Sequence, residues 1–208
     1  ACADGALRSV AEALNEQRPE RALELVDSTL QRFPHSRVAH LLAWEAHRRT
    51  GDDGPASGAW QRYLPEYSSD GMGHVISSSF VHQVPGSTAI SLARLDLGEL
   101  ALEILDRGAR DAGRYDPRAT ASMAKSYVRV ARYFFERDEL AMMEAALLHS
   151  LAVQPTEEAL KILALRPAAP AALDAALERW EQSRSPGEAV APIHREIGLA
   201  LRQQPAYR

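Results

Sequence analysis

Residues 21–34, RALELVDSTLQRFP, contain the pattern that decides the fold. Apolar side chains recur in this stretch at three- and four-residue spacing, which predicts an amphipathic helix, and Pro34 ends that helix. Four of its positions recur 34 residues later in the chain. Ala22, Val26, Thr29 and Leu30 are followed at that distance by Ala56, Trp60, Tyr63 and Leu64. A fixed displacement of this length predicts a repeated helical unit whose copies stack on one another.

The composition of the whole chain also favours helices. Its 208 residues are 46% hydrophobic, 25% charged and 6% aromatic, and Ala and Leu far outnumber Val and Ile. This balance argues against a β-sandwich, a barrel or a disordered chain. The net charge of −4 argues against a nucleic-acid-binding protein. The single cysteine excludes an intrachain disulfide.

Turn residues divide the chain into helices throughout, and no segment predicts a strand. Two pairs of helices are expected in residues 1–67. Residues 68–86, SSDGMGHVISSSFVHQVPG, have no helical periodicity and are expected to form an irregular insertion loop. Two further pairs are expected in residues 87–155, with a turn at Asp138. The helices of residues 156–208 are expected to form a C-terminal cap.

The stretch at 21–34 resembles the second helix of a tetratricopeptide repeat (TPR). That helix carries a small residue, a bulky residue four positions on and a proline twelve positions on. Ala22, Val26 and Pro34 have this spacing. A second good copy contains Tyr127, Val130, Ala131, Phe134, Met143, Leu147, Leu151 and Pro155. A weaker copy contains Ala89, Leu92, Ala101 and Leu105.

The resemblance implies an all-α fold of antiparallel helix pairs, stacked as a short TPR-like solenoid with a C-terminal helical cap. It covers about 150 residues of the chain. Two positions depart from the family pattern, because Trp44 stands where a small residue is expected and Ser68 stands where a proline is expected. A helical bundle with coincidental spacing is the alternative.

In such a solenoid the first helix of each pair lines the concave face, so the resemblance implies candidate residues for binding a partner. They are Glu45, Arg48, Arg49, Arg94, Lys125 and Arg132. We expect this groove to be basic and to receive another protein or an acidic peptide through charge-assisted hydrogen bonds. The alternative is that these residues are ordinary solvated side chains on exposed helix faces.

Segment 68–86 is the second candidate site, because a long stretch without helix inside a helical array is often a binding loop. Its candidate residues are His74, Ile76, Phe80 and His82. The segment is either a loop that grips a partner or a surface insertion held in place by Ile76 and Phe80.

The histidines and the presence or absence of known catalytic motifs indicate whether the sequence contains signs of a metal site or an active site. His40 or His47 could join His74 and His82 in a zinc site, since three imidazoles suffice, but these residues lie on unlinked elements. The sequence has no Gly-rich phosphate loop, no HExxH and no Gly-x-Ser-x-Gly motif. We therefore expect a protein that is not an enzyme, without a metal or a cofactor.

The Ala1-Cys2 pair resembles the processing site of a bacterial lipoprotein, whose lipidated cysteine follows a small residue. Lipidation of Cys2 would place the protein in the periplasm or on the envelope membrane; otherwise we expect it in the cytoplasm. The sequence thus predicts a non-catalytic protein–protein interaction scaffold or assembly factor. One alternative is an envelope lipoprotein that assists secretion or pilus assembly. The other is a helical enzyme, or a ligand- or metal-binding protein, that uses the 68–86 loop.

Overall fold

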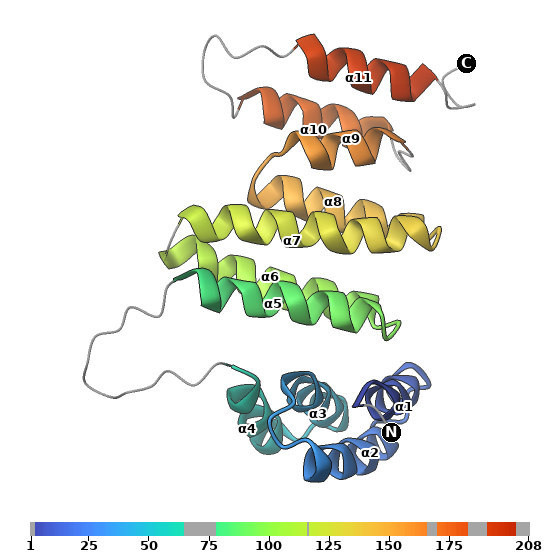
Figure 1. Cartoon of the computed structure of the whole chain (residues 1–208), viewed down its shortest axis with the longest axis vertical. Coiled ribbons are helices and arrows are strands. Elements are labelled where there is room, and N and C mark those ends of the chain that lie inside the picture. Colours follow the sequence, from blue (N-terminus) through green and yellow to red (C-terminus); the bar gives the residue numbers. More distant parts are fainter. Residues whose placement is uncertain (1–2, 65–77, 116, 166–169, 183–190, 203–208) are drawn as a thin grey trace. The chain divides into compact units, whose positions relative to one another are not determined.

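The described part of the chain consists of helices. The structure, a computed structural model, describes residues 3–64, 78–115, 117–165, 170–182 and 191–202. Within these ranges it contains eleven helices and no strand (Figure 1). The helices are α1 (Ala3–Asn15), α2 (Pro19–Arg32), α3 (Arg37–Thr50), α4 (Asp53–Tyr63), α5 (Ser78–Ala93), α6 (Gly98–Tyr115), α7 (Pro117–Glu136), α8 (Leu140–Val153), α9 (Glu157–Leu165), α10 (Pro170–Gln182) and α11 (Ala191–Arg202). The predicted all-α fold class is confirmed, whereas the TPR-like solenoid arrangement stays a prediction.

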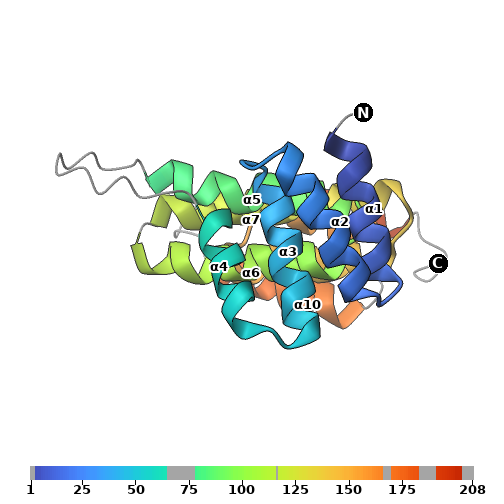
Figure 2. The same ribbon diagram turned by 90° about the horizontal axis from the view of Figure 1, so that it is seen from below.

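The chain forms two compact units. Unit 1 contains residues 1–76 and 91–98, and unit 2 contains residues 77–90 and 99–208. In unit 1, α1, α2, α3 and α4 pack against one another in chain order, and α1 also contacts α3 (Figure 2). Short turns join these helices, so each neighbour in the chain is also a neighbour in space.

Local sequence signals set the ends of the helices in unit 1. Pro19 occupies the start of α2, where a missing N–H costs nothing. The Ser36 hydroxyl caps α3 by accepting a hydrogen bond from the backbone N–H of Ala39. Gly51 ends α3 with a φ of 81°, a left-handed conformation that glycine adopts readily. These signals are local, and the sequence therefore predicts them well.

The positions that recur at 34 residues are largely buried in unit 1. Ala22 and Ala56 are buried in both copies, as are Thr29 and Tyr63. Val26 is fully buried, but its counterpart Trp60 is partly exposed. Leu30 is half-buried and its counterpart Leu64 is 39% exposed, so the last position of the recurrence does not pack in the core.

In unit 2, α7 and α8 form a closely packed antiparallel pair. Ala131 and Phe134 of α7 and Met143 and Leu147 of α8 are buried there. The turn that joins them places Asp138 at a φ of 62°, which confirms the predicted turn. The following helix, α9, contacts α7, α8, α10 and α11.

The predicted irregular segment 68–86 is wrong at its C-terminal end, because α5 begins at Ser78 and includes Pro85. A Cβ atom added to Gly86 would lie 2.3 Å from the Oγ of Ser126 in α7. A Cβ atom on Gly108 of α6 would lie 2.9 Å from the Cβ of Pro85. The Pro-Gly pair therefore allows α5 to approach its neighbours closely and does not form a turn.

The structure describes little of the four residues predicted to bind a partner in this loop. His74 and Ile76 lie outside the described residues, as does Cys2. Phe80 and His82 fall within α5, but their side chains are not among those described. Whether this segment binds a partner stays a prediction.

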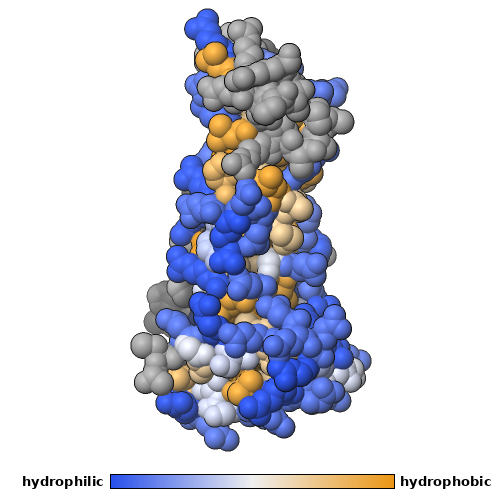
Figure 3. Space-filling view, turned by 90° about the vertical axis from the view of Figure 1, so that its right-hand side faces the viewer, coloured by the Kyte–Doolittle hydropathy of each residue, from blue (hydrophilic) through white to orange (hydrophobic). Residues whose placement is uncertain are grey.

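Hydrophilic residues cover most of the face shown in Figure 3, and apolar side chains appear between them in separate patches. No helix in the described ranges combines the length and the hydropathy that crossing a bilayer would need.

Candidate functional site

The predicted basic groove begins with Glu45 in α3, which the structure buries. Its side chain is 3% exposed, and both of its oxygens accept hydrogen bonds from arginines of the same helix. The Nε of Arg48 lies 2.8 Å from one oxygen and the Nε of Arg49 lies 2.6 Å from the other. The carboxylate of Glu45 is therefore occupied by contacts within α3, and its predicted contact with a partner stays a prediction.

The two arginines beside Glu45 are also used within the protein. Arg49 donates a further hydrogen bond of 2.7 Å to the carbonyl oxygen of Leu14, near the end of α1. The guanidinium of Arg48 lies 5.2 Å from the centre of the Trp44 ring. The cluster therefore ties α1 to α3, and its positive charges balance a buried negative charge.

The other predicted groove residues are exposed. Arg94 belongs to unit 1, whereas Lys125 and Arg132 lie on α7 in unit 2. Arg132 forms an ion pair of 2.5 Å with Glu158 of α9. Within unit 2, Lys125 and Arg132 are seven residues apart on one helix and therefore share a face.

The histidines of α3 have structural contacts. The Nε2 of His40 lies 2.9 Å from the carbonyl oxygen of Pro34, and the Nδ1 of His47 lies 3.8 Å from a carboxylate oxygen of Asp52. Among the described residues, no three His, Cys, Asp or Glu side chains lie together in a way that could hold a metal ion.

Trp44 of α3 and Trp60 of α4 pack against each other in unit 1 with their rings tilted. The ring centres of Trp44 and Trp60 are 4.9 Å apart, and Tyr63 continues the row at 5.1 Å from Trp60. These rings therefore fill the space between α3 and α4.

A cleft of about 350 Å³ lies among α6, α7 and α8 in unit 2. Two of these helices contribute three residues each, at positions i, i+3 and i+4, which is the spacing of one helix face. The third, α7, contributes Tyr127. The lining residues are Asp106, Ala109 and Arg110 of α6, Tyr127 of α7, and His149, Ala152 and Val153 of α8.

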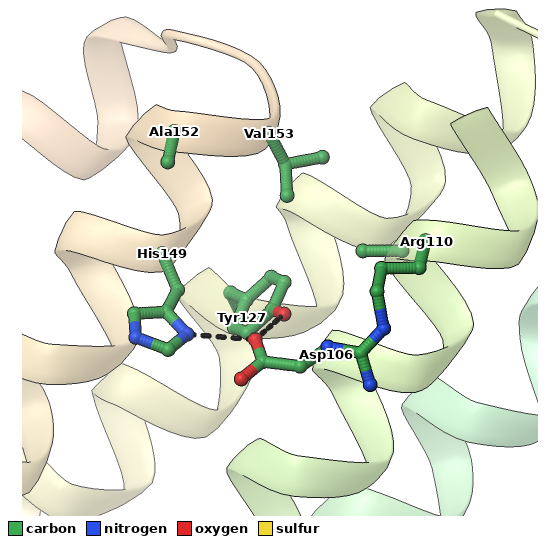
Figure 4. A pocket seen from close by; sticks show the side chains of 7 residues that line it. Asp106, Arg110, Tyr127, His149, Ala152 and Val153 are labelled. Atoms are coloured by element: carbon green, nitrogen blue, oxygen red, sulfur yellow. Dashed lines mark hydrogen bonds and ion pairs between the residues drawn. The ribbon is translucent and has the colours of Figure 1, made fainter.

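A carboxylate lies at the centre of this cleft. The Tyr127 hydroxyl donates a hydrogen bond to Oδ1 of Asp106, and the Nδ1 of His149 lies 2.7 Å from the same oxygen. Figure 4 shows Asp106 and Tyr127 between His149 on one side and Arg110 on the other, with Val153 and Ala152 above. One oxygen of Asp106 thus joins three helices.

Tyr127 is a permanent hydrogen-bond donor in this cluster. Its side chain is fully buried, and burial raises the pKa of the phenol far above its ordinary value of 10.0. The hydrogen bond to Asp106 and the negative charge of that residue raise this pKa further, while the positive charge of Arg110 acts in the opposite direction. The hydroxyl therefore stays protonated and donates to Asp106 throughout the physiological range.

The bonds to Asp106 determine what the cleft can offer to a ligand. If Nδ1 of His149 carries the proton that Asp106 accepts, Nε2 is the ring nitrogen left for other contacts. Oδ2 of Asp106 can accept a further hydrogen bond, and the exposed guanidinium of Arg110 can donate several. Ala109, Ala152 and Val153 supply small apolar walls. The cleft can therefore bind a small molecule that has both charged and apolar parts.

This cleft is not among the sites that the sequence predicts. Asp106 and His149 are 43 residues apart, and each begins an i, i+3, i+4 set on its own helix. This matching spacing is a sequence signal for two helix faces that could line one cleft. The predicted groove residues, in contrast, lie on the first helix of each predicted pair. The cleft instead uses α6 and α8, which are second helices in the predicted pairing.

Comparison of the chain with protein-family models, with curated proteins and with solved structures found no match.

Proposed function

We propose that this protein is a non-catalytic scaffold that binds an acidic segment of another protein. The observation that carries the proposal is a row of exposed basic side chains on α7, which we call the α7 basic stripe. It consists of Lys125, Arg129 and Arg132. Their spacing of four and three residues places the three cations on one face of the helix.

The opposite side of α7 explains why the stripe faces outward. Tyr127, Val130, Ala131 and Phe134 are buried, whereas Lys125, Arg129 and Arg132 lie on the exposed side of the same helix. Glu136 continues the exposed row at the C-terminal end of the helix and carries a negative charge. The stripe is thus positive along most of its length.

One carboxylate already pairs with this stripe. Glu158 at the start of α9 lies 2.5 Å from the guanidinium of Arg132. An acidic peptide lying along α7 would place its carboxylates in the same way on Lys125 and Arg129, where charge-assisted hydrogen bonds would hold them. Such contacts contribute modestly at an exposed surface, so we expect several to act together.

The test is capture of a partner from native lysate by the wild-type chain and by Lys125→Glu/Arg129→Glu. We expect a protein that the wild type retains and the charge-reversed variant loses. Arg48 is a poor choice for this experiment, because a negative charge there would face the buried Glu45. Helical content by circular dichroism and the unfolding midpoint should be unchanged, since both substituted residues are exposed.

A matched control is Arg179→Glu/Arg195→Glu, which makes the same change in net charge on α10 and α11 of unit 2. The control should retain the partner. Equal loss from both variants would indicate attraction by net charge alone. Equal retention by both, or no specific partner for any form, would contradict binding along the stripe.

A further inference from the structure

We propose that the cleft among α6, α7 and α8 binds a small zwitterion, an α-amino acid with a small apolar side chain. The proposal does not depend on the scaffold function, because it uses a different surface of unit 2. It is argued from the two charges of the cleft, from the donors that position one of them and from the size of the walls.

The cleft contains one negative and one positive group on the same helix. Asp106 and Arg110 are four residues apart on α6, so their side chains start about 5–6 Å from each other. Both line the cleft, and Arg110 is exposed. A molecule that carries an ammonium and a carboxylate on one carbon atom matches this pair, with its ammonium on Asp106 and its carboxylate on the guanidinium.

The cluster around Asp106 fixes the carboxylate in place through one oxygen and leaves the other oxygen for a ligand. Oδ1 accepts from the Tyr127 hydroxyl and faces Nδ1 of His149 at 2.7 Å. Because Tyr127 is fully buried and remains protonated, this side of the carboxylate is held in place by the protein. Oδ2 is therefore the atom that would accept the ligand ammonium. Tyr127 and His149 are positioning residues in this scheme.

The walls of the cleft limit the rest of the ligand. Ala109, Ala152 and Val153 end in methyl groups, which suit an apolar side chain and offer no hydrogen bond to a polar one. The volume of about 350 Å³ lies near the lower end of ligand sites, so it fits a single amino acid better than a nucleotide or a larger cofactor. Alanine and valine are the simplest ligands of this kind.

The experiment is a titration of the full-length chain with L-valine at up to millimolar concentrations, followed by NMR. The reporters are the ring protons of His149 and the methyl groups of Val153, because both residues line the cleft. Isobutyrate and isobutylamine, which carry only one of the two charged groups, are titrated in parallel. We expect L-valine to bind at least about tenfold more tightly than either compound, because each lacks one ion pair.

Variants test separately how the charges and the shape of the cleft contribute to binding. Arg110→Gln and Asp106→Asn should each weaken binding about tenfold or more. Ala152→Leu leaves both charges in place but fills the space, so it should abolish binding; Ala152 is exposed, so the fold should persist. Arg179→Gln, an exposed arginine on α10, is the matched control and should bind like the wild type.

Three results would overturn the proposal. The first is the absence of shifts at His149 and Val153 in the folded wild-type chain. The second is equal binding of isobutyrate or isobutylamine, which would indicate a simple anion or cation site. The third is unchanged binding in Ala152→Leu, which would place the amino acid elsewhere. None of these results bears on capture of a protein by the α7 basic stripe, so the two proposals fail independently.

Discussion

Units 1 and 2 each contain a cluster around a carboxylate that ties helices together, but the two clusters are built differently. In unit 1, Glu45 is almost fully buried and receives hydrogen bonds from two arginines of its own helix. In unit 2, the side chain of Asp106 is 31% exposed, and its partners come from two other helices. The carboxylate of the first cluster is closed to solvent although its arginines are partly exposed, and the second cluster opens into a cleft.

The comparison shows how burial separates a structural carboxylate from one that can bind a ligand. A fully buried charge must be balanced inside the protein, and Glu45 uses both of its oxygens for this purpose. Asp106 remains partly hydrated, so Tyr127 and His149 on one oxygen are sufficient.

The largest effect is expected when the buried carboxylate loses its partners. Arg48→Ala/Arg49→Ala leaves Glu45 charged and buried, and it also removes the bond from Arg49 to Leu14. We expect the free energy of unfolding to fall by about 3–5 kcal/mol, as measured by urea denaturation.

A control for this variant removes two exposed arginines from unit 1. Arg18 and Arg21 pair with Glu16 and Glu24, and all four side chains are more than half exposed. Arg18→Ala/Arg21→Ala should cost less than about 1 kcal/mol. If the two double variants were equally stable, Glu45 would not depend on its arginines.

The next largest effect is expected at Tyr127. Replacing this residue with phenylalanine removes a buried donor to a charged carboxylate, so unfolding should become easier by about 1.5–3 kcal/mol. The control is Tyr133→Phe on the same helix, where the hydroxyl accepts a hydrogen bond of 3.2 Å from the exposed Arg137. Its effect should stay within about 0.5 kcal/mol. A cost at Tyr127 no larger than that of the control would show that the cluster does not join the helices.

The sequence predicts most of the helices but not their mutual contacts. Pro19, Ser36 and Gly51 act within one turn of the chain, so the ends of α2 and α3 can be read from local patterns. The start of α5 cannot be read in this way. Pro85 and Gly86 are residues typical of a turn. Their helical conformation is explained only by the close approach of α5 to Gly108 and Ser126.

For the candidate sites, too, the sequence predicts local features but not the contacts between helices. Lys125 and Arg132, predicted to bind a partner, are exposed beside an apolar helix face, and partner binding by them stays a prediction. The place of Glu45 at the α1–α3 contact could not be predicted from the sequence. The apolar pattern of α3 does not show whether a charged residue of that helix is buried with a paired charge. The cleft around Asp106 depends on three helices that meet through tertiary packing, and a repeat pattern does not specify which side chains converge there.

The alkaline limb of the stability curve tests Tyr127 in a second way. The pKa of Tyr127 is raised in the folded protein, whereas in the unfolded chain it is near the ordinary 10.0. The proton is therefore held more tightly in the folded state. The stabilisation is complete below pH 10 and declines as the pH rises above 10, because only the unfolded chain ionises.

The change is measured as the stability difference between the wild type and Tyr127→Phe at several pH values. This difference should shrink by about 1 kcal/mol between pH 10 and pH 11. Other tyrosines titrate in both proteins and cancel. Parallel stability curves for the two proteins above pH 10 would mean that Tyr127 ionises as easily in the folded state as in the unfolded chain.

The smallest effect on stability is expected from Asp106→Asn. The amide oxygen of asparagine can still accept from Tyr127 and His149, and the partly exposed side chain loses little by becoming neutral. We expect a change of less than about 1 kcal/mol in urea denaturation, whereas Glu45→Gln should cost about 1.5–3 kcal/mol because it weakens bonds to two arginines. A large loss of stability in Asp106→Asn would place Asp106 with Glu45 as a structural carboxylate. A small loss together with loss of valine binding would instead separate them, because the negative charge would then be needed for the ligand and not for the fold.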